Sequence, residues 1–286
     1  MSQPHITPWN YLAERMTDDA YTPPGRPSPQ DLIGYRRFLC AAVADTERPS
    51  ALILGATPDL RDLLYEEGVA CTVLDCNPDM IEQMTAIRQH CDPNETVVVS
   101  DWINNTLPSE SFDVILGDFV ISNIPWDKQQ DFFLSVARLL KRNGRFITRM
   151  SSLTDDWRDF DVMQVLEKYQ RLPEHPWRPM ELFCEIFWNT HNPDTHSSGG
   201  PHVVAALHPF GRTGEWRHPD KKIELLFARM WEFWKPMDKV WTLETLSELR
   251  RRFETYFCIE DEHRSRDHQM SAHAPTWMGR PRSRFI

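Results

Sequence analysis

The sequence lacks the features that mark secreted, membrane-spanning and cysteine-rich proteins. Only six of its 286 residues are cysteine, and no two of them form a CxxC pair, so we expect buried free thiols rather than disulfides. No apolar run approaches the roughly 20 residues of a membrane-spanning helix. The first residues, MSQPHITPWNYLAERM, hold no apolar signal core. We therefore expect a cytoplasmic protein that has no membrane partner.

Positive charge is also scarce. The chain has 32 lysine and arginine residues against 42 aspartate and glutamate residues, which gives a formal net charge of -10. Because nucleic-acid binding depends on neutralising phosphates with lysine and arginine, we expect no nucleic-acid partner. The length suits one large α/β domain with an elaboration, or two small domains. A monomer and a homodimer are both compatible with the sequence.

One stretch predicts a strand, a tight turn, a helix and a second strand. Residues 51–54 are apolar, and Thr57 and Pro58 then suit the cap and the first position of a helix. A second apolar run, residues 70–74, ends at Asp75. This βαβ beginning implies a parallel sheet with ligand chemistry at the carboxyl ends of its strands.

The alternation of strands and helices continues to about residue 150. Further strands are predicted over residues 96–100, 112–116 and 145–150, and helices over residues 28–44, 77–90 and 126–142. Five strands with intervening helices favour an α/β fold with a Rossmann-like, doubly wound sheet.

Three other segments are expected to surround this core, residues 28–150. Residues 1–27 form an aromatic and polar arm that either docks as a tail or closes a ligand site as a lid. Residues 151–256 are predicted to be a mainly helical insertion that covers the substrate, with a long loop or flap over residues 191–220, and eight of the eleven tryptophans follow residue 150. Residues 257–286 would add two antiparallel strands, giving a seven-stranded, mostly parallel sheet.

Small, acidic and aromatic residues follow successive strands. A tight turn at Gly55 lets the backbone approach a ligand closely. Asp75, one strand over, can accept hydrogen bonds from both hydroxyls of a ribose. Asp101 can bond an adenine amino group while the neighbouring Trp102 ring packs on the base. The strand ends therefore predict a ligand that contains adenosine.

The order of these segments resembles the class I S-adenosylmethionine-dependent methyltransferases. The resemblance covers about residues 28–150 and extends to the two last strands. The matching segments are, in order, LILGATPDL, VLDCNPDM, VVVSDW, FDVILGDFVISNIP and LLKRNGRFI. The first segment departs from the glycine-rich pattern of that family, since only Gly55 remains, and it is similar to a subgroup with an LGxTPEL motif. The resemblance implies S-adenosylmethionine as the cofactor.

The resemblance also implies the cofactor-binding residues. The first turn would bind the amino acid part of the cofactor, Asp75 its ribose, Asp101 its adenine, and the residues after the fourth strand would face the methyl donor. Arg26 is a candidate for binding the methionine carboxylate. The full expected set is Tyr21, Arg26, Gly55, Ala56, Thr57, Asp75, Cys76, Asn77, Met80, Ser100, Asp101, Trp102, Gly117, Asp118 and Phe119.

Methyl transfer needs few catalytic groups from the protein. Catalysis consists chiefly of placing a nucleophile in line with the methyl group in a water-poor pocket, and a base is needed only if the acceptor must lose a proton. The candidates are Asp118, His191, His202 and His208. Asn123 either caps the next helix or contacts the substrate. The histidine spacing matches no standard ligand motif, so no metal is expected.

Three functions fit these features. The leading hypothesis is a methyltransferase that acts on a small natural-product or amino acid-like acceptor. An alternative enzyme would use S-adenosylmethionine as its sole substrate and close it to azetidine-2-carboxylate, with release of methylthioadenosine. A second alternative is a non-catalytic binding protein on the same fold.

Overall fold

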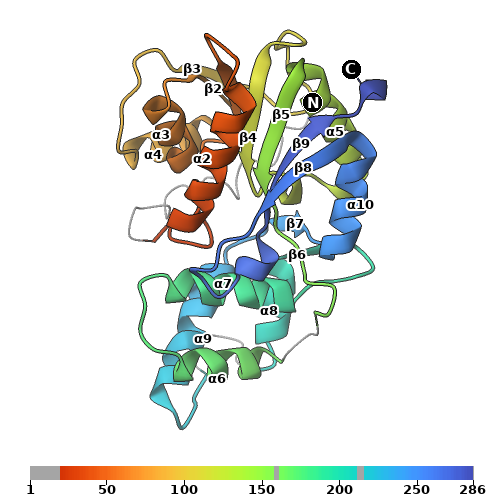
Figure 1. Cartoon of the computed structure of the whole chain (residues 1–286). Coiled ribbons are helices and arrows are strands. Elements are labelled where there is room, and N and C mark those ends of the chain that lie inside the picture. Colours follow the sequence, from red (N-terminus) through yellow and green to blue (C-terminus); the bar gives the residue numbers. More distant parts are fainter. Residues whose placement is uncertain (1–19, 158–160, 211–215, 286) are drawn as a thin grey trace.

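A seven-stranded sheet forms the centre of the computed structural model, which describes residues 20–157, 161–210 and 216–285 (Figure 1). The strand order is β3-β2-β1-β4-β5-β9-β8. Its strands are β1 Ser50–Leu54, β2 Ala70–Asp75, β3 Thr96–Val99, β4 Phe112–Asp118, β5 Leu140–Arg149, β8 Phe257–His263 and β9 Thr276–Pro281. The predicted seven-stranded, mostly parallel α/β architecture is confirmed.

The two last strands differ in direction. β1 to β5 are parallel to one another, whereas β9 runs antiparallel to β5. β8 pairs antiparallel with β9, so it points the same way as the first five strands. The expectation of two antiparallel strands is therefore right for β9 alone.

Helices cover both faces of the sheet. Their bounds are α2 Pro29–Val43, α3 Pro58–Glu66, α4 Pro78–Ala86, α5 Gln129–Leu139 and α10 Leu246–Tyr256, with short 3-10 turns at η1 Ile121–Asn123, η2 Trp126–Lys128, η3 Ser271–His273 and η4 Ser283–Phe285. Side chains alternate between the faces along a strand. Ile53 packs in the cluster with α2, α3 and α4, whereas its neighbours Leu52 and Leu54 pack with α5 and α10.

Local signals set the helix boundaries. Ser28 and Asp31 form a reciprocal capping box at α2, and the Asn77 side chain accepts a hydrogen bond from the backbone of Met80 at α4. Thr57 occupies the cap position of α3 but its side chain makes no cap bond. α4 and α5 end earlier than predicted. β5 begins earlier than predicted because Leu140 already pairs with β4.

A second, mainly helical region lies beyond the carboxyl ends of the parallel strands, below the sheet in Figure 1. It consists of α6 Val162–Arg171, α7 Arg178–Asn189, α8 Gly200–Leu207 and α9 Lys221–Trp234, with a small sheet of β6 Ser197–Gly199 and β7 Val240–Thr242. The mainly helical insertion predicted between the fifth strand and the last two strands is present. The predicted flap over residues 191–220 is wrong in part, because β6 and α8 form within it.

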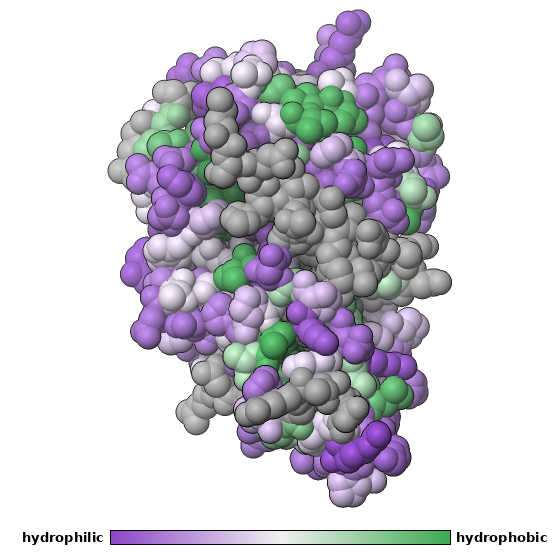
Figure 2. All heavy atoms as spheres, turned by 180° about the vertical axis from the view of Figure 1, so that it is seen from behind, coloured by the Kyte–Doolittle hydropathy of each residue, from purple (hydrophilic) through white to green (hydrophobic). Residues whose placement is uncertain are grey.

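The surface follows the usual division between polar exterior and apolar interior. From behind, hydrophilic side chains cover most of the visible coloured face and hydrophobic ones form small patches (Figure 2). Within the described part of the chain, no helix combines the length and the apolar character needed to cross a membrane.

One buried hydroxyl ties α2 to the ends of two central strands. The Tyr35 hydroxyl donates to the carbonyl of Gly117 at 2.6 Å and accepts from the backbone N–H of Arg149 at 2.8 Å. The Tyr35 side chain is fully buried. Two backbone groups at the carboxyl ends of β4 and β5 thus depend on a single side chain.

Replacing this hydroxyl should destabilise the fold. We expect Tyr35→Phe to lower the free energy of unfolding by about 1–3 kcal/mol, because it leaves buried polar groups without a partner. Urea unfolding monitored by circular dichroism measures the change. Tyr65→Phe is the matched control, since Tyr65 is 45% exposed, and an equal effect of both substitutions would contradict the assignment.

Candidate functional site

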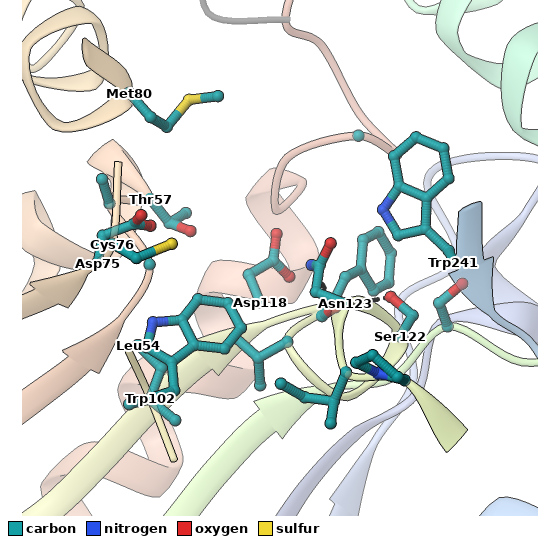
Figure 3. Close-up of a pocket in the computed structure, with 18 of the residues that line it drawn as sticks. Leu54, Thr57, Asp75, Cys76, Met80, Trp102, Asp118, Ser122, Asn123 and Trp241 are labelled. Carbon is teal, nitrogen blue, oxygen red and sulfur yellow. Dashed lines mark hydrogen bonds between the residues drawn. The ribbon is translucent and has the colours of Figure 1, made fainter. Parts of the chain in front are cut away.

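A cavity of about 630 Å³ lies at the carboxyl ends of the parallel strands. Gly55 follows β1, Asp75 ends β2, Trp102 follows β3 and Asp118 ends β4, and all four residues line it. In Figure 3, Asp75 and Cys76 lie on one side of the cavity and Trp241 on the other. Parallel sheets of this type bind ligands at this edge.

Most of the expected cofactor-binding residues come together here. Those that line the cavity are Tyr21, Gly55, Ala56, Thr57, Asp75, Cys76, Met80, Asp101, Trp102, Asp118 and Phe119. Four others are not among its lining residues. Asn77 caps α4, the Ser100 N–H donates to the carbonyl of Asp75, Gly117 accepts from Tyr35, and Arg26 is engaged elsewhere.

The turn after β1 has a conformational need for glycine. Gly55 has φ +85°, in the left-handed region that side chains disfavour. A Cβ there would lie 3.6 Å from the Trp102 ring and 3.8 Å from the Asp75 carboxylate. The next residue, Ala56, has no positive φ, so the single glycine of the segment stands where the backbone requires it.

The Asp75 carboxyl is buried at the end of β2. Its Oδ1 accepts from the backbone N–H of Asn77 at 2.8 Å. Burial raises the pKa of Asp75 to about 6, against the opposing effects of backbone hydrogen bonds from Asn77 and Cys76 and of the Lys239 charge. The group is therefore mainly ionised at neutral pH and can accept hydrogen bonds from a ligand.

Asp101 and Trp102 form the next part of the wall. Asp101 Oδ1 accepts from the backbone N–H groups of Ile103 and Asn104, at 2.9 and 2.8 Å. The Trp102 indole donates to the carbonyl of Leu74 at 2.8 Å, which fixes the ring beside the Gly55 turn. These bonds hold a carboxylate and an aromatic face next to each other, as the sequence predicted.

Asp118 is held by an arginine that the sequence analysis did not identify. Arg149, at the end of β5, binds Asp118 through Nε at 2.7 Å and Nη2 at 3.0 Å. Its Nη1 donates to Asp31 at 2.8 Å, and its Nη2 to the carbonyl of Pro24 at 2.9 Å. The side chains of Arg149 and Asp31 are fully buried. One guanidinium thus connects β4, β5, α2 and the segment before α2.

This network shifts the ionisation of its carboxyl groups. Burial raises the pKa of Asp118 to about 6, although Arg149 opposes the shift. Burial also acts to raise the pKa of Asp31, but Arg149 and hydrogen bonds from His268 and Ser28 hold it below its usual value. At neutral pH the arginine therefore faces two ionised carboxylates.

The aromatic residue after Asp118 completes this corner. Phe119 has φ +53°, a conformation that is strained for a residue with a side chain. Its ring centre lies 4.1 Å from the Arg149 guanidinium carbon. The same arginine thereby fixes both a carboxylate and an aromatic ring of the cavity wall.

The arm residues have separate roles. Arg26 donates through Nε and Nη2 to the two carboxylate oxygens of Asp59, at 3.0 and 2.7 Å. This ion pair fastens the arm to the first turn of α3, so Arg26 has a structural partner rather than a place in the wall. Tyr21 does line the cavity, and burial raises the pKa of its hydroxyl above the usual value. Trp9, which the sequence also offers as an arm residue that could help close the ligand site, lies outside the described residues.

The four candidate catalytic residues do not come together. Asp118 lines the cavity, whereas His191, His202 and His208 are not among its lining residues. His202 lies in α8, and burial lowers its pKa. In the part of the chain that the structure describes, no cluster of three or more histidine, cysteine, aspartate or glutamate residues is arranged to hold a metal ion.

The helical region forms another wall of the cavity, and none of its lining residues was predicted individually. This wall is apolar and aromatic, and its main contributors are Met180, Phe183, Phe187, Trp188, Phe233, Trp234, Met237 and Trp241. The tryptophan-rich composition was a signal for an enclosed pocket. The composition could not identify which helix faces line it.

Asn123 also lines the cavity. Its Nδ2 donates to the carbonyl of Phe119 at 3.1 Å, and its Oδ1 is buried without a hydrogen-bond partner. It ends η1 and does not cap α5. Of the two interpretations from sequence, a contact to a bound molecule therefore fits this position.

Removing the Arg149 cation should be costly. We expect Arg149→Met to lower the free energy of unfolding by about 3–5 kcal/mol, because it leaves two buried carboxylates without their counter-charge. Denaturant unfolding at pH 7 measures the loss. Arg145→Met on the same strand is the control, since its pair with Glu260 is partly exposed and should contribute about 0–1 kcal/mol. Equal losses would refute the role of Arg149.

Solved structures of other proteins share this fold. The N-methyltransferase NodS of Bradyrhizobium japonicum, in complex with S-adenosylhomocysteine, has a TM-score of 0.52 at 10% identity, over 96% of this chain and 98% of that one. The CcbJ methyltransferase of Streptomyces caelestis has a TM-score of 0.54 at 14% identity, over 95% of each chain. A Rhodobacter sphaeroides protein named after zinc-dependent alcohol dehydrogenases has a TM-score of 0.57 at 15% identity, over 97% of this chain and 100% of that one. Identities this low indicate the fold alone.

A family model described as a methyltransferase domain matches residues 55–148. No curated protein matches the chain. The matched region runs from the Gly55 turn into β5, and so it includes the strand ends that form the core side of the cavity. Residues 55–148 are therefore similar to a methyltransferase domain, and S-adenosylmethionine is the cofactor that this likeness indicates.

Proposed function

We propose that this protein transfers a methyl group from S-adenosylmethionine to a small-molecule acceptor. The observation that carries the proposal is the extent of the cavity. It begins at Gly55 and Asp75 on the sheet and continues to Phe187 of α7 and Trp234 of α9. A cavity that extends beyond the expected cofactor residues leaves space for a second molecule.

The core side of the cavity suits the cofactor. The ionised Asp75 can accept both ribose hydroxyls, and Asp101 with Trp102 offers a carboxylate and a ring to adenine. The Gly55 turn lets the backbone come close to the methionine part. When bound, the cofactor supplies an activated methyl group on a sulfonium, which the rings of Phe119 and Tyr21 can stabilise by cation–π attraction.

The remaining residues contribute position and exclusion of water. The aromatic side chains of α7 and α9 keep the acceptor in a water-poor space, and holding it in line with the methyl group supplies most of the rate. Asp118 is oriented by Arg149 and can accept a hydrogen bond from an amine of the cofactor or acceptor. No histidine is among the described lining residues, so we assign no histidine as the base.

Binding of the cofactor tests this arrangement. We expect calorimetry to detect S-adenosylmethionine binding, and Asp75→Ala to weaken it by about tenfold or more, because hydrogen bonds to a charged group contribute about 1.5–3 kcal/mol. Asp79→Ala is the control, since Asp79 is exposed in the first turn of α4. An unchanged affinity in Asp75→Ala would contradict the site.

Cofactor affinity should also depend on pH. The pKa of Asp75 is about 6, and only the ionised carboxylate accepts both ribose hydroxyls. We therefore expect the dissociation constant to be lowest above pH 7 and to rise as the pH falls through 6. Asp75→Asn should remove most of this dependence, whereas an identical profile in the variant would assign it to another group such as Asp118.

The products separate transfer from the alternative reaction. With the cofactor alone, we expect no methylthioadenosine, and we expect S-adenosylhomocysteine only when an acceptor is added. Methylthioadenosine formed from the cofactor alone would overturn methyl transfer in favour of cyclisation. Mass spectrometry of the reaction mixture detects both compounds.

A further inference from the structure

We propose that the acceptor is a neutral, planar aromatic molecule that carries one hydrogen-bond donor and one hydrogen-bond acceptor. This inference rests on the proposed methyl transfer and specifies its second substrate. It is drawn from three properties of the cavity: where its charges lie, how its rings are oriented, and which buried polar atoms have no partner.

Charge is confined to the core side of the cavity. Its charged lining residues among those described are Asp75, Asp101, Asp118, Lys128 and Asp131, which lie at or after the ends of β2, β3 and β4, in η2 and in α5. The described lining residues from the helical region carry no charge. Cys184 there stays neutral, because burial raises the pKa of its thiol to about 12.

The nearby Lys239 does not add a charge to the lining of the cavity. Lys239 is not among the lining residues, and its ammonium lies 5.1 Å from the centre of the Trp241 ring. Its charge interacts with that of Asp75 on the core side of the cavity. A carboxylate or phosphate on the acceptor would therefore lose its hydration against α7 and α9 without gaining a counter-charge there, which is unfavourable.

The aromatic wall is built from rings that contact one another. Phe187 and Trp234 are parallel within 7° with ring centres 6.3 Å apart, and Trp241 stands at 82° and 87° to them. Phe183 and Phe233, which also line the cavity, stack with their ring centres 4.2 Å apart. Rings that fix one another in this way present surfaces to which a planar, apolar molecule packs well.

Three polar atoms of residues that line this cavity are buried without a hydrogen-bond partner. They are Oδ1 of Asn123, Nε1 of Trp188 and Nε1 of Trp234. The Asn123 amide must place Nδ2 toward the carbonyl of Phe119, so its Oδ1 is turned away and remains an acceptor. Buried polar groups are almost always paired in native proteins. A bound molecule that donates to Asn123 and accepts from one indole N–H would satisfy two of these three atoms.

These properties together favour an aromatic acceptor over an amino acid-like one. Such a molecule has no ionised group, stacks on the rings of the wall and carries, for example, a ring N–H beside a carbonyl. The acceptor side of the cavity would then recognise shape and two hydrogen bonds. The charges would be left to hold the cofactor.

Calorimetry with a defined probe tests the inference. The probe is quinolin-2-one, a neutral planar lactam, titrated into protein saturated with S-adenosylhomocysteine. Quinoline-2-carboxylate is the charged comparison. We expect quinolin-2-one to bind at least tenfold more tightly than the carboxylate. No measurable binding of quinolin-2-one, or tighter binding of the carboxylate, would overturn the inference.

A matched pair of variants tests the indole contact. Trp234→Phe keeps an aromatic ring but removes the N–H, and we expect it to weaken quinolin-2-one binding about twofold to tenfold, the range of one net hydrogen bond. Trp231→Phe, a buried change in the same helix at a residue that does not line the cavity, should leave the affinity unchanged. Equal effects of the two substitutions would refute the contact.

The two proposals fail in different ways. S-adenosylhomocysteine binding is measured in the same samples before the probe is added. If it binds and quinolin-2-one does not, the aromatic acceptor is wrong while methyl transfer stands. If neither the product nor S-adenosylmethionine binds to folded protein, methyl transfer itself is refuted.

Discussion

The buried guanidinium of Arg149 is the interaction on which the site depends. It binds Asp118 on β4 and Asp31 on α2, and it donates to the carbonyl of Pro24 before that helix. Removing charges from water is costly, and only a complete set of partners offsets that cost. The network therefore fixes the ends of β4 and β5 relative to the start of α2. The same guanidinium fixes the position of Phe119, whose ring packs on it.

Local rules account for the part of the site that could be predicted. Gly55, Asp75 and Trp102 each follow a short apolar run, and the end of such a run marks the carboxyl end of a strand. Parallel strands then bring these residues to one edge whatever the rest of the chain does. The Ser28 cap is equally local. This is why residues separated by long stretches of sequence could be assigned to one cofactor site.

The unpredicted parts depend on packing between distant segments. In the sequence, Arg149 is simply the end of an apolar strand. Its partner Asp31 is 118 residues away, so no sequence motif indicated the ion pair between them. α7 and α9 could be predicted as helices, but which face lines the cavity is decided by how they pack on each other. The histidines were expected on a flap. Because β6 and α8 form in that segment, the backbone there is fixed in regular structure, and its histidines are not among the lining residues of the cavity.

The two regions of the chain supply different physical properties to one cavity. The sheet contributes carboxylates and a backbone turn, which suit a cofactor rich in polar and charged groups. The helical region contributes rings without charge, which suit a second molecule held by shape. Methyl transfer requires both, since the donor must be fixed by directional bonds while the acceptor must lose its water and keep its alignment. Arg149 links the two sides of the cavity. It orients the Asp118 carboxylate, which lies where the charged side of the cavity meets Asn123 and the aromatic wall.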